Sequence, residues 1–220
     1  GGDRGNRDRG GERGDRGRLH DFGGYLDDPE TSDVLFEVEG RELRAHRIVL
    51  LCSRASEVFR AMLRHPMREA TCASQPIRID DLDFDVFRHL LQYLYTGECE
   101  MPPHLAAPLM LACERYMVYP LQLECARTLV HALDADSLWS ALTLAASLQL
   151  PPPADASPNE PRPADVLREA AVLYLCDSPA LPDLAGAPDF ARFAAEIVPR
   201  IHDELAARLQ QLLLHQAQAR

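Results

Sequence analysis

Residues 32–63 read SDVLFEVEGRELRAHRIVLLCSRASEVFRAML, and this stretch decides the fold because its pattern changes from strand to helix. Apolar and other residues alternate over Val34–Val38, which is typical of a half-buried strand. Gly40 follows in a two-residue turn, since glycine readily takes the positive φ that such a turn requires. With a return strand over 41–45, the sequence predicts a β-hairpin.

Two short helices are predicted directly after the hairpin. The first covers residues 46–51, and the second starts at Ser56. The second helix has one apolar face at helical spacing, which consists of Val58, Phe59, Met62 and Leu63. A third strand is expected over residues 76–80, which read PIRID.

From Asp83 onward the apolar residues recur at helical spacing. Asp83 and Asp136 are expected to cap the first turns of two helices. Gly97 is expected to end one helix, and Pro120 to lie in the first turn of another. Three short strands followed by helices predict an α+β fold in which helices dominate. The first two apolar stripes are Phe84, Phe87, Leu90, Leu91 and Leu94, then Leu105, Leu109, Met110, Cys113 and Met117.

The charge of the chain argues against nucleic acid as the main partner. The formal net charge is -11 at pH 7, whereas phosphate binding depends on clustered lysine and arginine. Residues 1–18 hold six arginines, but Asp3, Asp8, Glu12 and Asp15 offset most of their charge. Because this segment has no apolar residue to bury, we predict a disordered Gly/Arg-rich linker, with RNA binding as the alternative.

Six prolines interrupt the helical pattern between residues 151 and 163, which read PPPADASPNEPRP. Proline cannot continue a helix, so an exposed inserted loop is predicted there. The alternative is a ligand for a proline-recognising domain. Helical patterns resume at 165–175 and at 190–214, and Pro199 is expected to kink or split the second of these.

Nothing in the sequence indicates an enzyme. The six cysteines are widely spaced without a C-x-x-C pair, which argues against a zinc site and against a secreted disulfide scaffold. Reduced thiols in a cytoplasmic or nuclear protein are expected. Since nucleotide-binding and metalloprotease motifs do not occur, no catalytic residue, cofactor or metal is predicted. No apolar run approaches the roughly 20 residues that cross a bilayer, so no membrane partner is predicted.

Four motifs within these predicted elements are specific. S-D-V precedes the first strand, A-H follows the second, V-F-R-A-M lies at 58–62 and Y-L-Y-T-G at 93–97. Through these motifs the chain resembles a BTB/POZ domain over residues 19–133. The resemblance implies a small β-sheet flanked by helices. Residues 134–220, with the proline-rich insertion at 151–163, are similar to the helical BACK-like extension that often follows such domains.

Two segments near the ends of the chain indicate which subgroup of BTB proteins it resembles. GGYLDDPETSDVLFEVEGRELRAH near the start and EIVPRIHDEL near the end are similar to BTB regions at the C-terminus of armadillo-repeat or ankyrin-repeat proteins. No such repeats occur in this chain. The resemblance therefore implies that repeats precede residue 1 and that regions outside this chain bind a substrate protein.

The function implied by the resemblance is protein–protein contact without catalysis. Many BTB domains form homodimers and bind the N-terminal region of cullin-3, acting as substrate adaptors of a ubiquitin ligase. The alternative is a BTB scaffold that self-associates or binds a transcriptional partner without a cullin.

Met67 and Glu69 follow Pro66 at the place of the family's hydrophobic-x-Glu cullin motif. An exposed methionine can fill an irregular pocket on a partner, and a glutamate two residues later can supply a charge-assisted hydrogen bond. The alternative is that Met67 packs on its own domain and Glu69 is a solvated surface charge.

Two further pairs of residues match functional positions of the family. Tyr116 and Tyr119, in the segment RYMVYP, fall where further cullin contacts are expected, with packing of this loop as the alternative. Asp33 and His46 match the charged pair near the dimer surface. His46 is either protonated and paired with Asp33, or a buried histidine held by hydrogen bonds.

Overall fold

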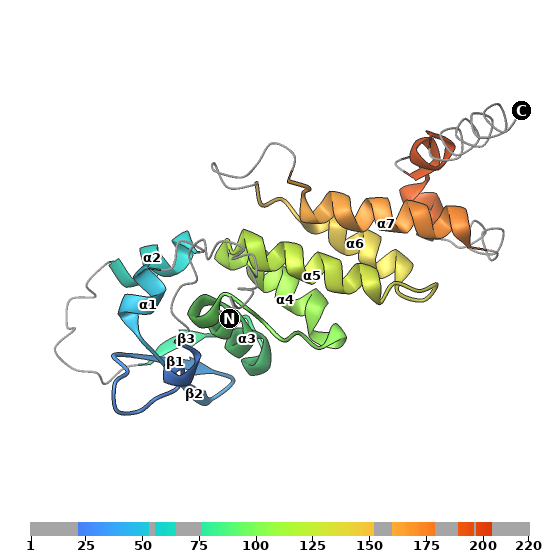
Figure 1. Ribbon diagram of the computed structural model, residues 1–220. Helices are drawn as coiled ribbons and strands as arrows, with labels where there is room; N and C mark the ends of the chain where they lie inside the picture. The colour runs from blue at the N-terminus through green and yellow to red at the C-terminus, as the bar shows by residue number, and fades with distance from the viewer. Residues whose placement is uncertain are drawn as a thin grey trace, which may run out of the picture.

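The computed structural model of the chain describes residues 22–52, 56–64, 76–151, 160–178, 189–195 and 197–203. Figure 1 shows a small sheet with two short helices at one end of the molecule and longer helices that extend away from it in layers. The predicted succession of three strands and then helices is confirmed. The predicted linker at residues 1–18 lies outside the described residues, and so does its RNA-binding alternative.

The hairpin has the predicted bounds. β1 (Val34–Val38) and β2 (Arg41–Ala45) pair antiparallel along their whole length. Glu39 and Gly40 join them with φ values of 51° and 74°, as a type I′ turn requires. β3 (Ile77–Ile79) pairs parallel to β1 on its other side, which gives the sheet order β2-β1-β3.

The core lies between the sheet and the helices that follow it. A short 3-10 helix, η1 (Gly23–Tyr25), precedes the hairpin, and α1 (Arg47–Cys52) and α2 (Glu57–Arg64) follow it. The alternating β1 side chains Val34, Phe36 and Val38 are all buried, as their period of two predicts. The hairpin and the two short helices therefore contribute to one hydrophobic core.

Three longer helices complete this first core. They are α3 (Phe84–Thr96), α4 (Pro103–Tyr116) and α5 (Tyr119–His131). The predicted stripe of α3 is buried throughout. Pro120 lies in the first turn of α5 as predicted, where its missing N–H costs no helical hydrogen bond.

The two ends of α3 differ in how well the sequence predicted them. Gly97 ends the helix with φ 74°, and its N–H donates to the Tyr93 carbonyl oxygen at 2.8 Å, as expected for a glycine stop. Asp83 occupies the N-cap position as predicted, but its side chain makes no capping hydrogen bond. The N–H of Phe84 donates instead to Glu39 Oε2 at 3.0 Å, because the hairpin turn brings Glu39 to the start of α3.

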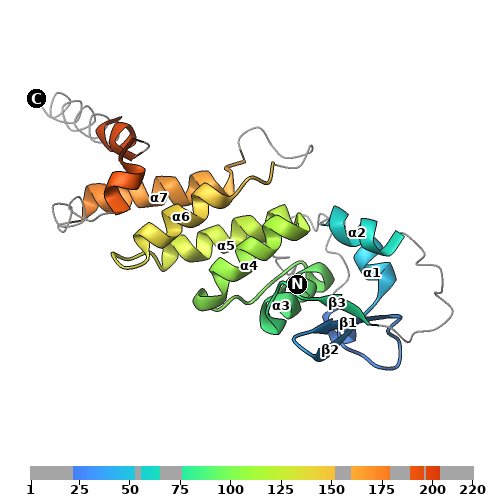
Figure 2. The same ribbon diagram turned by 180° about the vertical axis from the view of Figure 1, so that it is seen from behind.

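The helices beyond α5 lie along its outer side, as both views show (Figures 1 and 2). They are α6 (Leu138–Ser147) and α7 (Pro163–Asp177). The predicted cap by Asp136 is wrong because α6 begins at Leu138, with Ser137 at the capping position. The proline-rich loop also ends earlier than predicted, since Pro163 is already the first residue of α7, where proline is tolerated.

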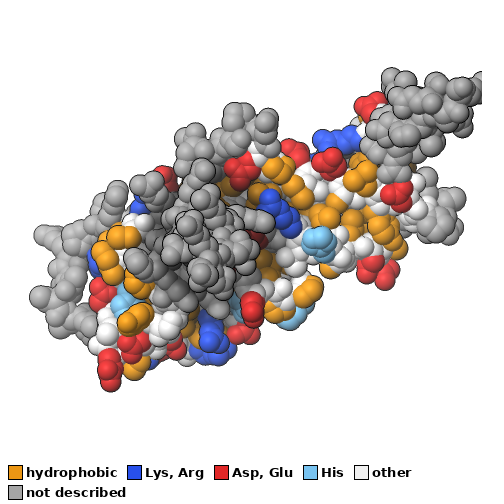
Figure 3. All heavy atoms as spheres, in the orientation of Figure 1, with side chains coloured by type: hydrophobic (Ala, Val, Ile, Leu, Met, Phe, Trp, Pro, Cys, Tyr) orange, Lys and Arg blue, Asp and Glu red, His pale blue; other side chains and the backbone are white. Residues whose placement is uncertain are grey.

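A second, smaller apolar cluster lies on the far side of α6 and α7. The helical residues 189–195 and 197–203 contribute Phe193 and Ile197, which are 6% and 1% exposed. The Trp139 ring stacks on Phe193 with the centroids 6.3 Å apart. Figure 3 shows further hydrophobic side chains at the surface of this half of the molecule. Within the described ranges, no helix is long and apolar enough to cross a membrane.

Replacement of Glu39 tests the observed cap of α3. Glu39→Ala is expected to lower the free energy of unfolding by about 1 kcal/mol, because the Phe84 N–H loses its acceptor. Asp83→Ala is the matched control, since its side chain makes no capping hydrogen bond to α3. Urea unfolding measures both variants, and equal losses for the two would contradict the assignment.

Candidate protein-interaction surface

α2 is held against the end of α4 by one buried serine and one pair of rings. Ser56 Oγ donates to the Tyr116 carbonyl oxygen at 2.6 Å and accepts the Phe59 N–H at 3.2 Å, which also caps α2. The rings of Phe59 and Tyr116 stack with their centroids 4.9 Å apart. These contacts fix α2 relative to residues 116–120, which we call the α4–α5 corner.

The sequence predicted Tyr116 and Tyr119 in a loop, and this prediction is wrong. Tyr116 is the last residue of α4, and Tyr119 is the first residue of α5. Their side chains are 3% and 4% exposed. Burial raises the pKa of Tyr116 to about 12, and the Asp81 carboxylate raises it further while Arg115 opposes the shift. Both tyrosines pack the corner, which is the structural role that the sequence left open for them.

Met117 and Pro120 are the exposed residues of the corner, and the sequence placed Met117 wrongly in the apolar stripe of α4. Met117 is 40% exposed and ends α4 with φ 56°, a conformation usually taken by glycine. A non-glycine residue pays about 1 kcal/mol or more for this conformation. Pro120 was the sequence signal that could have predicted this exposure. A proline in the first turn of α5 indicates that α4 ends just before it, so Met117 lies at a helix end.

Asp33 and His46 occupy different hydrogen-bond networks. Asp33 Oδ1 accepts the Arg47 N–H at the start of α1, at 2.7 Å. The His46 N–H donates to the Tyr95 hydroxyl oxygen at 2.6 Å, and the ring nitrogens lie 3.0 Å from that oxygen and 2.9 Å from the Thr31 hydroxyl. Both residues thus tie the end of the hairpin to its neighbours. His46 is half-buried rather than buried, so it matches only the hydrogen-bonded part of the second alternative.

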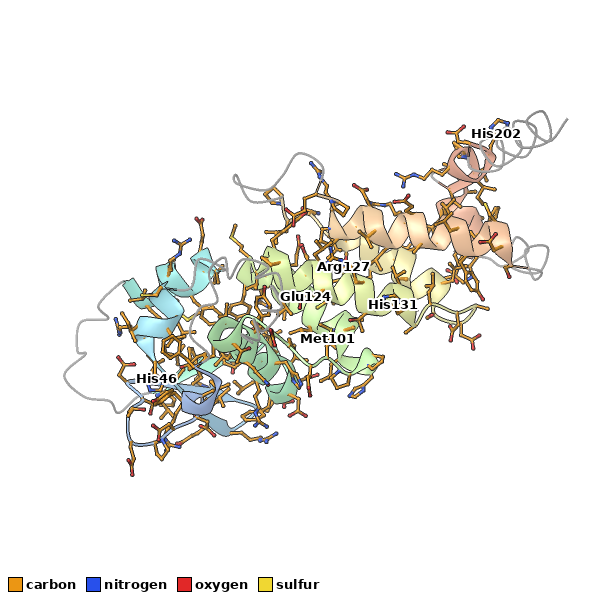
Figure 4. All side chains as sticks on the ribbon, viewed as in Figure 1. His46, Met101, Glu124, Arg127, His131 and His202 are labelled. Carbon is orange, nitrogen blue, oxygen red and sulfur yellow. The ribbon has the colours of Figure 1, made fainter. Side chains whose placement is uncertain are left out.

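Exposed apolar side chains lie close to this network. Ile48 on α1 is 64% exposed, and Tyr25 of η1 is 53% exposed. The Tyr25 ring meets the His46 ring edge-on, with the centroids 6.4 Å apart. Figure 4 places His46 at the sheet end of the molecule, whereas Glu124, Arg127 and His131 lie along α5. Exposed apolar side chains therefore occur both at the corner and beside the hairpin.

A family model described as the BTB/POZ domain matches residues 22–133, which is half of the chain. The chain belongs to the BTB/POZ family. This assignment agrees with the mixed three-stranded sheet and its helices, and it confirms the fold predicted from the four motifs. The BTB/POZ domain is a protein–protein interaction module without catalytic activity.

The similar proteins include plant and mouse BTB/POZ proteins. Armadillo BTB Arabidopsis protein 1, from Arabidopsis thaliana, is 27% identical over 80% of this chain and 21% of its own length. The Arm repeat protein interacting with ABF2, from the same plant, is 35% identical over 43% of this chain and 13% of its own length. Mouse TD and POZ domain-containing protein 2 is 36% identical over 44% of this chain and 26% of its own length. The chain thus spans about a quarter or less of these relatives.

The solved structures include isolated BTB domains. The BTB domain of zebrafish PATZ1 has a TM-score of 0.42 and 21% identity, over 51% of this chain and 88% of that domain. The BTB domain of human Gigaxonin has a TM-score of 0.37 and 18% identity, over 44% of this chain and 77% of that domain.

Two cysteines on neighbouring helices, Cys113 of α4 and Cys125 of α5, belong to the core. Cys113 and Cys125 are both fully buried on helical faces, as predicted. Burial raises the pKa of Cys113 well above its ordinary value, and the neighbouring Cys125 raises it further. A thiol with a raised pKa is a small hydrophobic residue rather than a nucleophile. In the described part of the chain, no group of three or more His, Cys, Asp and Glu side chains could hold a metal ion.

Met67 and Glu69 lie outside the described residues, since the described chain leaves α2 at Arg64 and resumes at Pro76. The structure does describe the elements on either side of them. The preceding helix, α2, is fixed to the α4–α5 corner by Ser56 and Phe59. Met67 therefore follows the last residue of α2, an element of fixed position, by only three positions in the sequence.

Proposed function

We propose that this BTB/POZ chain docks the N-terminal region of cullin-3 and serves as a substrate adaptor of the ubiquitin ligase. The observation that carries the proposal is the joint placement of α2 and the α4–α5 corner. Met67 and Glu69 follow α2, and the exposed Met117 lies at the corner to which α2 is fixed. An exposed methionine can fill an irregular pocket on a partner, and a carboxylate can orient that partner by a charge-assisted hydrogen bond.

The span of this surface suits one partner. α2 has eight residues, so its end lies about 12 Å from its start at the corner. A typical interface covers about 800 Å² on each partner, which is wide enough to include both ends of α2. The proposed surface therefore consists of Met67, Glu69 and Met117, with Tyr116 and Tyr119 as the buried support that orients the corner.

The rest of the chain is proposed to join this adaptor to its substrate. Residues 134–220 would form a BACK-like extension, since α6 and α7 pack on α5 and build their own apolar cluster. Similarity to armadillo BTB proteins of Arabidopsis supports armadillo repeats before residue 1 in the full-length protein. Such repeats, rather than this chain, would bind the substrate.

Titration calorimetry of the 220-residue chain with the N-terminal region of cullin-3 tests the proposal. We expect a Kd in the micromolar range or lower. Met67→Ala/Glu69→Ala is expected to weaken binding more than tenfold, which corresponds to about 1.4 kcal/mol, because the anchor and its orienting carboxylate are lost together.

Glu57→Ala is the matched control for this titration. Glu57 lies on α2 with its side chain 74% exposed, and its ion pair with Arg60 is a surface pair that contributes little. This variant is expected to bind like the wild type. A folded wild-type chain that binds no cullin-3 would overturn the proposal.

Self-association without a cullin is the second candidate function, and the exposed apolar pair beside the hairpin favours it. Ile48 and Tyr25 are each more than half exposed, and they flank the His46 network. An isologous dimer buries one such patch against its own copy. This surface would make the chain a scaffold, and it is compatible with cullin binding at the separate α4–α5 corner.

Ile48→Asp is expected to convert a dimer to a monomer, because two carboxylates would meet across the two-fold axis in an apolar contact. Sedimentation equilibrium measures the mass. Leu173→Asp, on the outer side of α7 and 37% exposed, is the control and is expected to leave the mass unchanged. A wild-type chain that sediments as a monomer at high micromolar concentration would exclude this dimer.

A further inference from the structure

An open groove of about 470 Å³ lies between α4, α6 and the start of the helical residues 189–195. Its apolar wall consists of Leu111 of α4, which is 48% exposed, with Trp139 and Leu144 of α6. Its polar residues are Ser140, Thr143, Ser147 and Asp189. Ligand pockets range from roughly 300 to 1,000 Å³, so this groove suits one long side chain rather than a whole helix. It shares no residue with the α4–α5 corner or with the surface beside the hairpin.

Two phenyl rings hold the indole ring of Trp139 at the edge of this groove. The indole stacks on Phe193 with an angle of 8° between the planes, and it meets Phe190 edge-on with the centroids 6.2 Å apart. The same cluster already attracts one guanidinium, since Arg192 lies over the Phe193 ring, 5.2 Å from its centroid. Cations are attracted to the faces of aromatic rings, and most strongly to tryptophan. The part of the Trp139 ring that lines the groove therefore suits a second cation.

Two of the three hydroxyl groups in the groove have already used their protons. The Thr143 hydroxyl donates to the Trp139 carbonyl oxygen at 2.8 Å, and the Ser147 hydroxyl donates to the Leu144 carbonyl oxygen at 2.7 Å. A hydroxyl carries a single proton, so these two oxygens can only accept a further hydrogen bond. Among the described residues that line the groove, none is basic. The groove thus offers mainly acceptors and calls for a ligand that donates.

The Asp189 carboxylate supplies a negative charge without a counter-charge. No basic side chain in the described part of the chain forms an ion pair with it. Arg192, one turn later, lies over Phe193 instead. The formal net charge of -11 also favours the approach of a cation over that of an anion. An apolar wall, an aromatic ring and an unpaired carboxylate therefore meet in one groove.

We propose that this groove binds an arginine side chain of a partner protein. The aliphatic stem of that arginine would pack on Leu111 and Leu144, while its guanidinium would lie on the Trp139 ring and donate to Asp189. A guanidinium fits better than the ammonium of lysine, because it is planar, stacks on aromatic rings and can donate to one carboxylate through two N–H groups. The site does not depend on cullin-3 binding.

Fluorescence titration of the 220-residue chain tests the proposal, since Trp139 is its only tryptophan. The probe is a blocked glycine pentapeptide with one central arginine. We expect a saturable change in Trp139 emission with a Kd in the millimolar range, and weaker binding in added salt, which screens the charge contact. The same peptide with a central lysine is expected to bind about threefold more weakly. Peptides with a central leucine or glutamate are expected to leave the emission unchanged.

Asp189→Asn tests the carboxylate while keeping the size of the side chain. This variant is expected to bind the arginine peptide about tenfold more weakly, because a charge-assisted hydrogen bond is lost. Asp136→Asn is the matched control, since Asp136 is exposed about one turn before Ser140 and does not line the groove. The control is expected to bind like the wild type. Equal losses in the two variants would show that only the overall charge matters and would overturn the site.

Each remaining outcome also decides the proposal. Preference for the arginine peptide, lost in Asp189→Asn at an unchanged thermal unfolding midpoint, would establish the site. Unchanged emission, together with an unmoved Trp139 indole N–H resonance in NMR spectra up to the solubility limit of the arginine peptide, would overturn it. Tighter binding of the leucine peptide would also overturn it, because the groove would then accept an apolar side chain. None of these outcomes bears on the cullin-3 titration.

Discussion

Four aromatic rings hold the BTB/POZ domain together, and each comes from a different element. Phe36 of β1, Phe59 of α2, Phe87 of α3 and Tyr116 of α4 lie with neighbouring centroids 4.9 to 6.2 Å apart. Ring pairs at this range contribute about 0.5–1.5 kcal/mol each beyond the area they bury. Because Tyr116 is also the last residue of α4, the cluster fixes the corner where the helical layer turns back on itself.

The corner connects the two halves of the chain through α5. Leu121 and Cys125 face the first core, while Tyr119 and Gln122 reach the segments that flank the proline-rich insertion. Ala145 of α6 and Leu167 of α7 also belong to the first core, so the extension is not a separate body attached by a linker. A partner that docks at the corner would therefore contact the BTB/POZ domain and the extension at once.

Local patterns predicted the elements well, and contacts between distant segments account for the errors. The alternation over Val34–Val38 and the turn at Gly40 were sufficient for the hairpin, since both signals are local. The side chain that accepts the Phe84 N–H belongs to Glu39, 45 positions earlier, so the sequence could place Asp83 at the N-cap but could not identify the acceptor. The candidate site shows the same difference between what the sequence could predict and what only the fold determines. The prediction of a cullin motif at Met67 and Glu69 came from family resemblance alone, whereas burial of Tyr116 and Tyr119 and exposure of Met117 depend on how α4 turns into α5.

Amide hydrogen exchange of the chain, with and without the N-terminal region of cullin-3, tests most directly whether the α4–α5 corner is the docking surface. The account predicts slower exchange on binding in α2 and in residues 117–122, with no change in the hairpin. Slower exchange confined to the hairpin, η1 and α1 would contradict it. The surface beside Ile48 would then be the site of contact.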